Sequence, residues 1–553
     1  MKLILHIAVL ILGTCNLLSG QTFSEILGRP TNSSVTMNIL FDQNVDVYWE
    51  YGTSSGMYPM STPTITASKD VPVEYDIVNL LANTRYYYRT RYRDGGGTGD
   101  FVAGTEHHFQ TQRPKGNSFT FAIESDPHMD TNSNPSAYAL TLQNISAKGP
   151  DFMLDLGDIF MSEKLPNKIQ SEITKRHVLY RPYYGEVCPS VPLYIVIGNH
   201  EGELGWSLDG TANSLPVMAS NTRKLYYPNP LPNSFYTGDT VAENFVGLRG
   251  NYYAWEWGNA LFIVLDPYWY TVTKPGWGWT LGAIQYNWFK KVITNSHARF
   301  KFVFCHQLVG GNGNDGRGGI EFARFWEQGG ENADSTWGFN NNRPGWIKTV
   351  HELMIENNAN IYFHGHDHFF GKQDMDGIVY QECPQPSNKN IKSYSASQYG
   401  YVNGVLMPGR GYLLINVTDT NARVDYIKTL LPSEETTTDK NGDIGYSYSL
   451  TSKTDGIAEY IDQTTDPQLG QNFPNPFQQE TEIKYITTRV GEVQLSVYDV
   501  FGREITRLVD LKQAAGTYSV KLDASKLNMK PGIYYCMLTT EHKTQSKKMI
   551  RSN

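Results

Sequence analysis

Short runs of strand-forming residues recur through the central part of the chain, and each one stops at a small or turn-forming residue. Such runs, rich in β-branched and aromatic residues, are typical of strands. Asp, Asn or His stands within three positions after five of them. We therefore expect buried strands whose ends present polar side chains. The five runs are residues 119–123, 152–156, 193–197, 300–305 and 361–363.

Helical periodicity alternates with these strands. Residues 135–147, 283–293 and 346–357 place apolar side chains three or four positions apart, which predicts one helix in each range. Strands that alternate with helices of this length indicate a layered α/β domain.

Two further stretches of the central region have distinct patterns. Residues 252–257 and 260–266 are strand-like runs on either side of Gly258 and Asn259, which predicts a hairpin. Residues 203–250 are rich in Gly, Asn, Pro and Tyr and show little periodicity. Because this stretch is too long for an ordinary connection, we expect an insertion over the site or a partly ordered lid.

Both ends of the chain show strand patterns without helices. Residues 21–113 and 471–553 contain short alternating runs separated by turn residues, which indicates a small β-sandwich in each. The α/β domain lies between them at residues 114–450, and the Thr- and Asp-rich residues 451–470 form a linker. The sequence therefore predicts an α/β protein in which a layered core is flanked by two small all-β sandwich domains.

The first twenty residues are typical of a secretory signal. Met1 and Lys2 precede a short apolar run, and the small residues Ser19 and Gly20 predict cleavage before Gln21. An N-terminal membrane anchor is the alternative, but the apolar run is short for one. No later segment is long and apolar enough to span a bilayer, so we expect no transmembrane span in the mature chain.

Length, charge and cysteine usage narrow the class of protein. With 553 residues the chain is too long for one core, and its formal net charge of −8 gives no electrostatic footprint for a polyanion such as duplex DNA. We therefore expect no specific nucleic-acid partner. The cysteines beyond the signal are far apart and form no CxxC motif, which favours buried thiols or at most one disulfide over a zinc knuckle. Whether Cys188, Cys305 and Cys383 form a disulfide stays open.

The polar residues at the strand ends are of the types that bind metal ions. Imidazole nitrogens with hard oxygens suit Zn²⁺, Mn²⁺ or iron, and one shared carboxylate can hold two cations about 3.5–4 Å apart. Any single histidine here would more often be structural. Five histidines, two aspartates and one asparagine gathered at the ends of five strands indicate a metal centre instead.

Taken in chain order, these residues resemble the motif set of the calcineurin-like metallophosphoesterases: Asp126-x-His128, Gly157-Asp158, Gly198-Asn199-His200, His306 and Gly365-His366-x-His368. The resemblance implies a layered β-sandwich phosphoesterase core with two divalent or mixed-valence metal ions (Fe, Zn or Mn). It also implies that Asp158 bridges the two ions. One ion would take Asp126, His128, Asp158 and His368, and the other would take Asp158, Asn199, His306 and His366.

The same resemblance implies a mechanism for hydrolysis of phosphate mono- or diesters. A hydroxide that bridges the two ions would attack in line, because two cations lower the pKa of bound water and neutralise the phosphoryl group. His200, the motif residue left without a metal, would give a proton to the leaving oxygen or hydrogen-bond the phosphoryl oxygens. Its orienting partner would be an unidentified carboxylate or backbone oxygen. The residues do not decide between monoesters and diesters.

The N-terminal region refines this resemblance. Residues 47–52 and 81–88 resemble the fibronectin type III-like domain that precedes the catalytic domain in many secreted metallophosphatases. Purple acid phosphatases share this layout, but they need a tyrosine three positions after the bridging aspartate, where this chain has Met161. We therefore expect no tyrosinate-to-iron colour, and the resemblance is to the broader superfamily.

The C-terminal region resembles the sorting domain of the type IX secretion pathway of Gram-negative bacteria. The resemblance rests on Asn-Phe-Pro-Asn-Pro-Phe at 472–477 and on Val-Tyr-Asp-x-x-Gly-Arg at 497–503. It implies the type IX machinery as a partner and export to the cell surface or the medium. A β-sandwich that acts as a binding module is the alternative.

Residues outside the motifs could contact a substrate. Arg317, on the glycine-rich loop 310–319, could clamp a phosphate group or could be a solvent-exposed arginine. Five aromatic residues could stack on a nucleoside or aryl leaving group or could simply pack. The five are Tyr268, Trp269, Tyr270, Trp277 and Trp279.

A second class of function competes with the enzyme. The two sandwiches could bind glycan or protein on a surface while the central domain holds a structural or vestigial metal centre. The complete motif set favours the enzyme, because a purely structural site would not need the unassigned His200.

Overall fold

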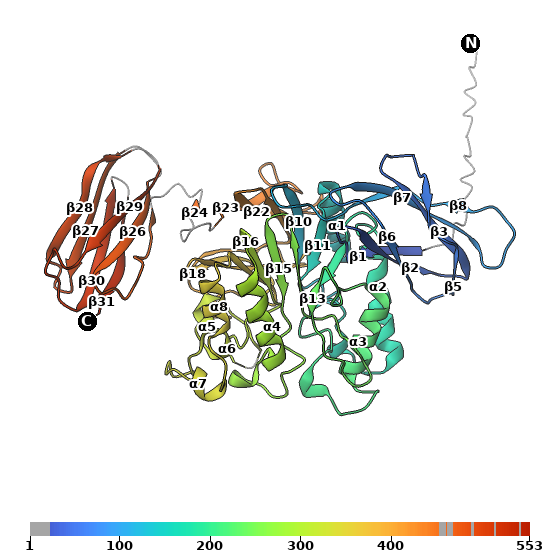
Figure 1. The fold of residues 1–553 in the computed structure, drawn as a ribbon, viewed down its shortest axis with the longest axis horizontal. Coiled ribbons are helices and arrows are strands. Elements are labelled where there is room, and N and C mark those ends of the chain that lie inside the picture. Colours follow the sequence, from blue (N-terminus) through green and yellow to red (C-terminus); the bar gives the residue numbers. More distant parts are fainter. Residues whose placement is uncertain are drawn as a thin grey trace, which may run out of the picture. The chain divides into compact units, whose positions relative to one another are not determined.

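The structure is a computed structural model that describes residues 23–313, 315–452, 460–461, 468–487, 491–513, 516–540 and 543–552. The chain divides into two compact units, Met1–Ala458 and Glu459–Asn553 (Figure 1). The predicted signal at residues 1–20 lies outside the described residues, as does most of the predicted linker at 451–470. None of the described helices is long and apolar enough to cross a membrane.

The first unit begins with an all-β region of two sheets. Trp49 and Tyr88 from one sheet are buried in the same core as Val35 and Ile77 from the other, so the two sheets pack face to face. One sheet contains β1 (Phe23–Gly28), β2 (Ser34–Phe41) and β6 (Val73–Val78). The other contains β3 (Val45–Gly52), β4 (Met60–Ser61), β5 (Ile65–Ala67), β7 (Arg85–Asp94), β8 (Val102–Ala103) and β9 (His107–Gln110).

Two larger sheets form the centre of the first unit. Their facing surfaces meet through phenylalanine rings, with the Phe121 and Phe262 centroids 5.1 Å apart and those of Phe152 and Phe262 5.3 Å apart. One sheet runs in the order β12 (Leu193–Ile195), β11 (Phe152–Asp155), β10 (Phe119–Glu124), β21 (Gly411–Val417), β22 (Asn421–Lys428) and β23 (Ile444–Thr451). The other runs β13 (Thr237–Gly238), β14 (Tyr253–Trp257), β15 (Ala260–Val264), β16 (Phe300–Phe304), β17 (Ile361–His364), β19 (Ile378–Glu382), β18 (Phe370–Met375) and β20 (Val405–Met407).

Helices cover the outer faces of both sheets (Figure 1). α1 (Pro135–Lys148), α2 (Gln170–Tyr184) and α3 (Leu215–Tyr226) bury residues against the first sheet, and α4 (Gly282–Asn295) and α8 (Val350–Glu356) bury residues against the second. The predicted layered α/β core is therefore present. The short elements are η1 (Ser162–Lys164), η2 (Gly205–Ser207), η3 (Gly276–Gly278), α5 (Ile320–Ala323), α6 (Trp326–Gly329) and α7 (Phe339–Asn342).

Most of the expected elements are confirmed, and two expectations need correction. The hairpin of β14 and β15 and the helices α1 and α4 lie where the sequence predicted them. The predicted helix at 346–357 begins only at Val350, because Thr349 caps its N-terminus in a capping box with Glu352. The stretch 203–250 is more regular than its pattern indicated, because it contains the helix α3. Its role as an insertion over the site stays a prediction.

The second unit is also all-β in its described residues. Ile483, Leu495 and Cys536 lie in one shared core, which fits a small sandwich. All four cysteines beyond the signal are buried free thiols. The domain limits expected from the sequence stay predictions. The strands are β24 (Tyr460–Ile461), β25 (Gln468–Leu469), β26 (Glu480–Thr487), β27 (Gly491–Asp499), β28 (Glu504–Gln513), β29 (Gly516–Asp523), β30 (Gly532–Thr540) and β31 (Thr544–Arg551).

Candidate metal centre

The polar residues predicted as ligands follow five strands that end at one edge of the two central sheets. In each sheet these strands run parallel, so the loops that leave their carboxyl ends converge there. Close packing explains two of the motif glycines. A Cβ on Gly365 would lie 2.5 Å from Oδ2 of Asp126, and one on Gly198 would lie 2.4 Å from Oδ1 of Asp158. Side chains at these two positions would push the loops apart.

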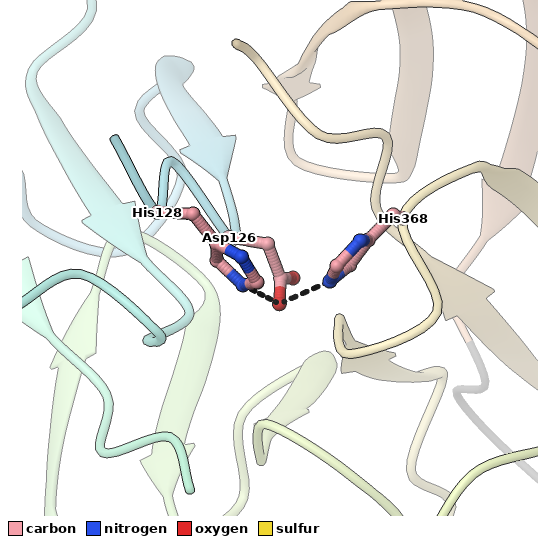
Figure 2. Close-up of side chains that lie close together, drawn as sticks. All are labelled: Asp126, His128 and His368. Atoms are coloured by element: carbon pink, nitrogen blue, oxygen red, sulfur yellow. Dashed lines mark ion pairs between the residues drawn. The ribbon is translucent and has the colours of Figure 1, made fainter. Parts of the chain in front are cut away.

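A first group of potential ligands consists of Asp126, His128 and His368. Figure 2 shows both imidazoles directed at the Asp126 carboxylate. Oδ1 of Asp126 lies 3.5 Å from Nε2 of His128 and 3.3 Å from Nε2 of His368. The loops after β10 and β17, which belong to different sheets, therefore supply one cluster.

A second group consists of Asp158, His306 and His366. Nε2 of His306 lies 3.3 Å from Oδ2 of Asp158 and 3.2 Å from Nδ1 of His366. The same Asp158 oxygen is 3.5 Å from Nε2 of His128 in the first group. Asp158 therefore lies between the two groups, where a bridging carboxylate would have to be.

Several polar atoms in this cluster are buried and lack a hydrogen-bond partner among the described residues. They include Oδ1 of Asp126, Nε2 of His128, Oδ1 of Asn199 and Nε2 of His368. Burying such atoms unpaired costs free energy, so native structures rarely leave them without a partner. Carboxylate, amide and imidazole donors are also the ligands that Zn²⁺, Mn²⁺ and iron take. The residues present therefore fit metal ions at this site.

Hydrogen bonds behind the histidines fix which ring nitrogen faces the pocket. Nδ1 of His306 lies 2.9 Å from the carbonyl oxygen of Leu156, and Nε2 of His366 lies 2.7 Å from the carbonyl oxygen of Asp315. Because a carbonyl only accepts, each of these nitrogens carries the proton and donates it. The opposite nitrogens, Nε2 of His306 and Nδ1 of His366, are therefore the ones placed to bind a cation.

Two buried glutamates, Glu201 and Glu382, hold the backbone of the ligand loops. Glu201 accepts hydrogen bonds from the backbone N–H groups of Asp158 and Ile159. Oε1 of Glu382, on β19, accepts those of Asp367 and His368 at 3.0 and 3.1 Å. Neither glutamate belongs to the motif set found in the sequence. Glu201 directly follows the Asn199-His200 pair and could have been noticed, whereas Glu382 carries no local signal.

The ligand loops have a backbone conformation that residues with a Cβ rarely adopt. Positive φ angles at functional sites store strain, which persists only where neighbouring contacts enforce it. The hydrogen bonds accepted by Glu201 and Glu382 are contacts of this kind. The strained positions are Asp126 (φ 61°), His128 (50°), Asp158 (58°), His366 (80°) and His368 (68°).

The charges in the pocket favour cations. Burial opposes ionisation of Asp126, but the imidazoles of His306 and His368 hold its pKa well below its usual value. Burial also disfavours a charged His306, yet the carboxylates of Asp158 and Asp126 raise its pKa to about 9. Burial and the charge of Asp158 raise the pKa of Glu201 to about 7. Metal ions entering this pocket would displace protons.

His200 lies beside the cluster, and its two ring nitrogens face two different carboxylates. Nε2 lies 3.8 Å from Oδ2 of Asp158, and Nδ1 lies 3.0 Å from Oε2 of Glu163 on η1. The contact with His200 lowers the pKa of Glu163. Glu163 is thus a carboxylate partner of the kind that the sequence left unidentified. Its place 37 positions before His200 gave no signal in the sequence.

The residues expected to touch substrate have other contacts. Nη1 of Arg317 donates to the carbonyl oxygen of His366 and to Oδ1 of Asp367, and its guanidinium lies over the ring of Tyr399. Of the five aromatic residues, Tyr268, Trp269 and Trp279 are buried, which favours packing over stacking on a substrate. Phosphate binding by Arg317 stays a prediction.

Comparison with known families agrees with the two patterns found in the sequence. Residues 119–370 match the family model described as calcineurin-like phosphoesterase. Residues 471–552 match the family model described as secretion system C-terminal sorting domain. No curated protein matches the chain at a significant level.

Solved structures similar to this chain include two with comparable folds. A structure described as that of PhoD shares 15% identity and a TM-score of 0.57, and the match covers 80% of this chain and 92% of that chain. The purple acid phosphatase PPD1 isolated from yellow lupin (Lupinus luteus) seeds shares 13% identity and a TM-score of 0.53, with 78% and 74% covered. At such low identity these likenesses concern the fold alone.

Proposed function

The chain carries a calcineurin-like phosphoesterase domain followed by a C-terminal secretion sorting domain, and from this premise we propose that it is an exported dinuclear-metal hydrolase of phosphate mono- or diesters. The observation that carries the proposal is the convergence of ligand-type side chains from four strand ends into two groups, in which several buried polar atoms lack a hydrogen-bond partner among the described residues. The sorting domain indicates export to the cell surface or the medium.

The proposed ligand sets follow the two groups and add residues beside them. Asp158 serves both ions, because its carboxylate contacts histidines of both groups. Asn199 joins the second set, since its Oδ1 is buried without a hydrogen-bond partner among the described residues. When bound, two ions supply Lewis-acid activation of the attacking water and neutralise charge on the phosphoryl group. The first set is Asp126, His128, Asp158 and His368, and the second is Asp158, Asn199, His306 and His366.

His200 is the proposed proton donor to the leaving oxygen. Glu163 takes the hydrogen bond from Nδ1, so the imidazole presents Nε2 towards the cluster. The hydrogen bond from Nδ1 to Glu163 also fixes the orientation of the ring that would donate from Nε2. The pair resembles other catalytic histidines that are oriented by an acidic side chain.

The test is metal analysis combined with turnover of simple esters. Purified protein should hold two ions of zinc, manganese or iron per chain and should hydrolyse an aryl phosphate, and the ratio of aryl monoester to bis-ester turnover assigns the substrate class. A chelator should abolish turnover, and added metal should restore it. Two firmly bound ions without turnover of either ester would instead favour the surface-binding alternative with a structural metal centre.

A further inference from the structure

Asp367 stands between two proposed ligands, His366 and His368, yet its side chain makes contacts away from the metal cluster. Oδ1 of Asp367 accepts a hydrogen bond from Nη1 of Arg317 at 3.0 Å. Oδ2 accepts one from the backbone N–H of Gly318 and one from the hydroxyl of Tyr401, both at 2.8 Å. A buried carboxylate thus ties together two segments that lie far from it in the sequence.

The segment bound by Asp367 returns to His366 through two further contacts. Nη1 of Arg317 lies 2.5 Å from the carbonyl oxygen of His366, and the carbonyl oxygen of Asp315 lies 2.7 Å from Nε2 of the same residue. Arg317 therefore holds the backbone of His366 while Asp315 orients its ring. The guanidinium of Arg317 also packs over Tyr399, 4.5 Å from the ring centroid.

We propose that Asp367 is a positioning residue for the second metal ion, and that Arg317 acts in this clamp rather than as a phosphate ligand. The inference rests on the proposed metal centre. Asp367 anchors Arg317 and Gly318, and this anchor keeps the Asp315 carbonyl where it fixes the ring of His366 with Nδ1 towards His306. We name the contacts among Asp315, Arg317, Gly318, Asp367 and Tyr401 the Asp367 clamp.

The backbone explains why such a clamp is needed. His366 and His368 both have positive φ angles, and a strained conformation relaxes unless neighbouring contacts enforce it. Glu382 holds the N–H side of the loop, and the Asp367 clamp holds the carbonyl of His366 and the intervening side chain. Partners that orient metal-binding histidines commonly affect metal affinity by about 10–100-fold.

The experiment measures metal affinity directly. Asp367→Asn replaces one acceptor oxygen by an NH₂ group, which cannot accept from Arg317 or, in the flipped orientation, from Gly318 and Tyr401. The Zn²⁺-loaded full chain is titrated with a chelator. This variant and Arg317→Ala should each release one ion at a chelator concentration about 10–100-fold lower than the wild type does. The other ion should keep about its wild-type affinity. Because both changes break one clamp, the double variant should lose less than the sum of the two.

Two variants control for effects on folding. Asp151→Asn removes the charge from another buried aspartate that pairs with an arginine, Arg113, at the start of β11 and away from the ligand loops. This variant should lower the unfolding temperature without lowering the affinity for either ion. Tyr401→Phe removes one donor and leaves the Asp367 charge in place, so it should give a smaller loss of the same ion even if Asp367→Asn folds poorly.

Different outcomes separate the possible failures. If Arg317→Ala keeps both ions but raises KM for the ester and weakens inhibition by inorganic phosphate, Arg317 binds phosphate and the clamp proposal is wrong. Unchanged metal affinity in Asp367→Asn and Tyr401→Phe also overturns it. Failure of the wild-type chain to bind two ions would instead refute the proposed metal centre itself.

Discussion

At the residue scale, the proposed ligands depend on hydrogen-bond acceptors that are not themselves proposed ligands. Glu201 and Glu382 accept hydrogen bonds from backbone N–H groups of the loops that carry Asp158 and His368. Side chains held in one geometry before a ligand arrives lose less freedom when it binds, which favours affinity. The carboxylates that accept these hydrogen bonds are therefore as much a part of the candidate site as the imidazoles of the two groups.

Removing the imidazole of His200 should separate catalysis from metal binding. His200→Ala should keep both ions and its fold, because His200 is not among the proposed ligands, but it should lower kcat by roughly 10²–10⁴-fold. Glu163→Gln should cause a smaller loss, since the amide oxygen still accepts from Nδ1 and keeps the ring oriented, although the carboxylate charge is gone. An alanine at His297, which is exposed before β16, is the matched control and should change nothing. A normal rate in His200→Ala would exclude the residue from the mechanism.

Neutralising the proposed bridge should affect both ions together. Asp158→Asn should lower the binding affinity for both ions, because a neutral amide bridges two dications poorly. Asp126→Asn should mainly lower the binding affinity for the ion of the first ligand set, which contains Asp126. Elemental analysis during stepwise chelation distinguishes the two patterns, and an Asp158→Asn protein with two firmly bound ions and full activity would refute the bridging role.

At the element scale, local patterns predicted what local residues determine. The strand ends and the polar residues that gather after them could be predicted because each motif lies within a few positions of its strand. α2 could not, because the residues it buries include His177 and Arg181, and Pro182 lies within it, so its apolar periodicity is weak. Glu163, Glu382 and the Asp367 clamp escaped detection because their partners lie 14 to 50 positions away.

The strand β1 joins the N-terminal sheets to the core and contains a pH-sensitive group. Glu25 is buried against Trp49, Tyr88 and Thr90, and burial raises its pKa to about 7 despite their hydrogen bonds. In the unfolded chain its pKa is near 4.5. The folded state therefore binds more protons between these values, and this contribution to stability is full at low pH and lost as pH rises through about 7.

Glu25→Gln should remove that dependence, because glutamine resembles the protonated acid at every pH. Urea unfolding of both proteins from pH 4.5 to 8 should show the variant gaining stability relative to wild type as pH rises. Subtracting the two curves of unfolding free energy against pH cancels the contributions of the other buried acids, which both proteins share. A constant difference across this range would show that Glu25 is not protonated in the folded protein.

At the scale of the whole molecule, the N-terminal sheets and the core belong to one compact unit. Arg181 of α2 donates to Oδ1 of Asn38 at 2.7 Å and to the carbonyl oxygen of Ser24 at 2.7 Å, while the N–H of Leu27 donates to the carbonyl oxygen of Cys188. Buried hydrogen bonds of this kind leave polar groups unpaired when one partner is removed. The N-terminal sheets are therefore a support for the core rather than an independent module.

The C-terminal unit should behave differently, because every proposed ligand lies in the first unit and the two units form separate compact bodies. Truncation after Ser452, which keeps β23 whole, should leave metal content, kcat and KM of the purified protein unchanged.

In the native host the same truncation should block export, so that active enzyme accumulates in the periplasm. We further expect the mature surface protein to lack most of residues 471–553, which mass spectrometry can show. A truncated protein that folds and binds two ions but has lost its activity would mean that the C-terminal unit takes part in substrate binding.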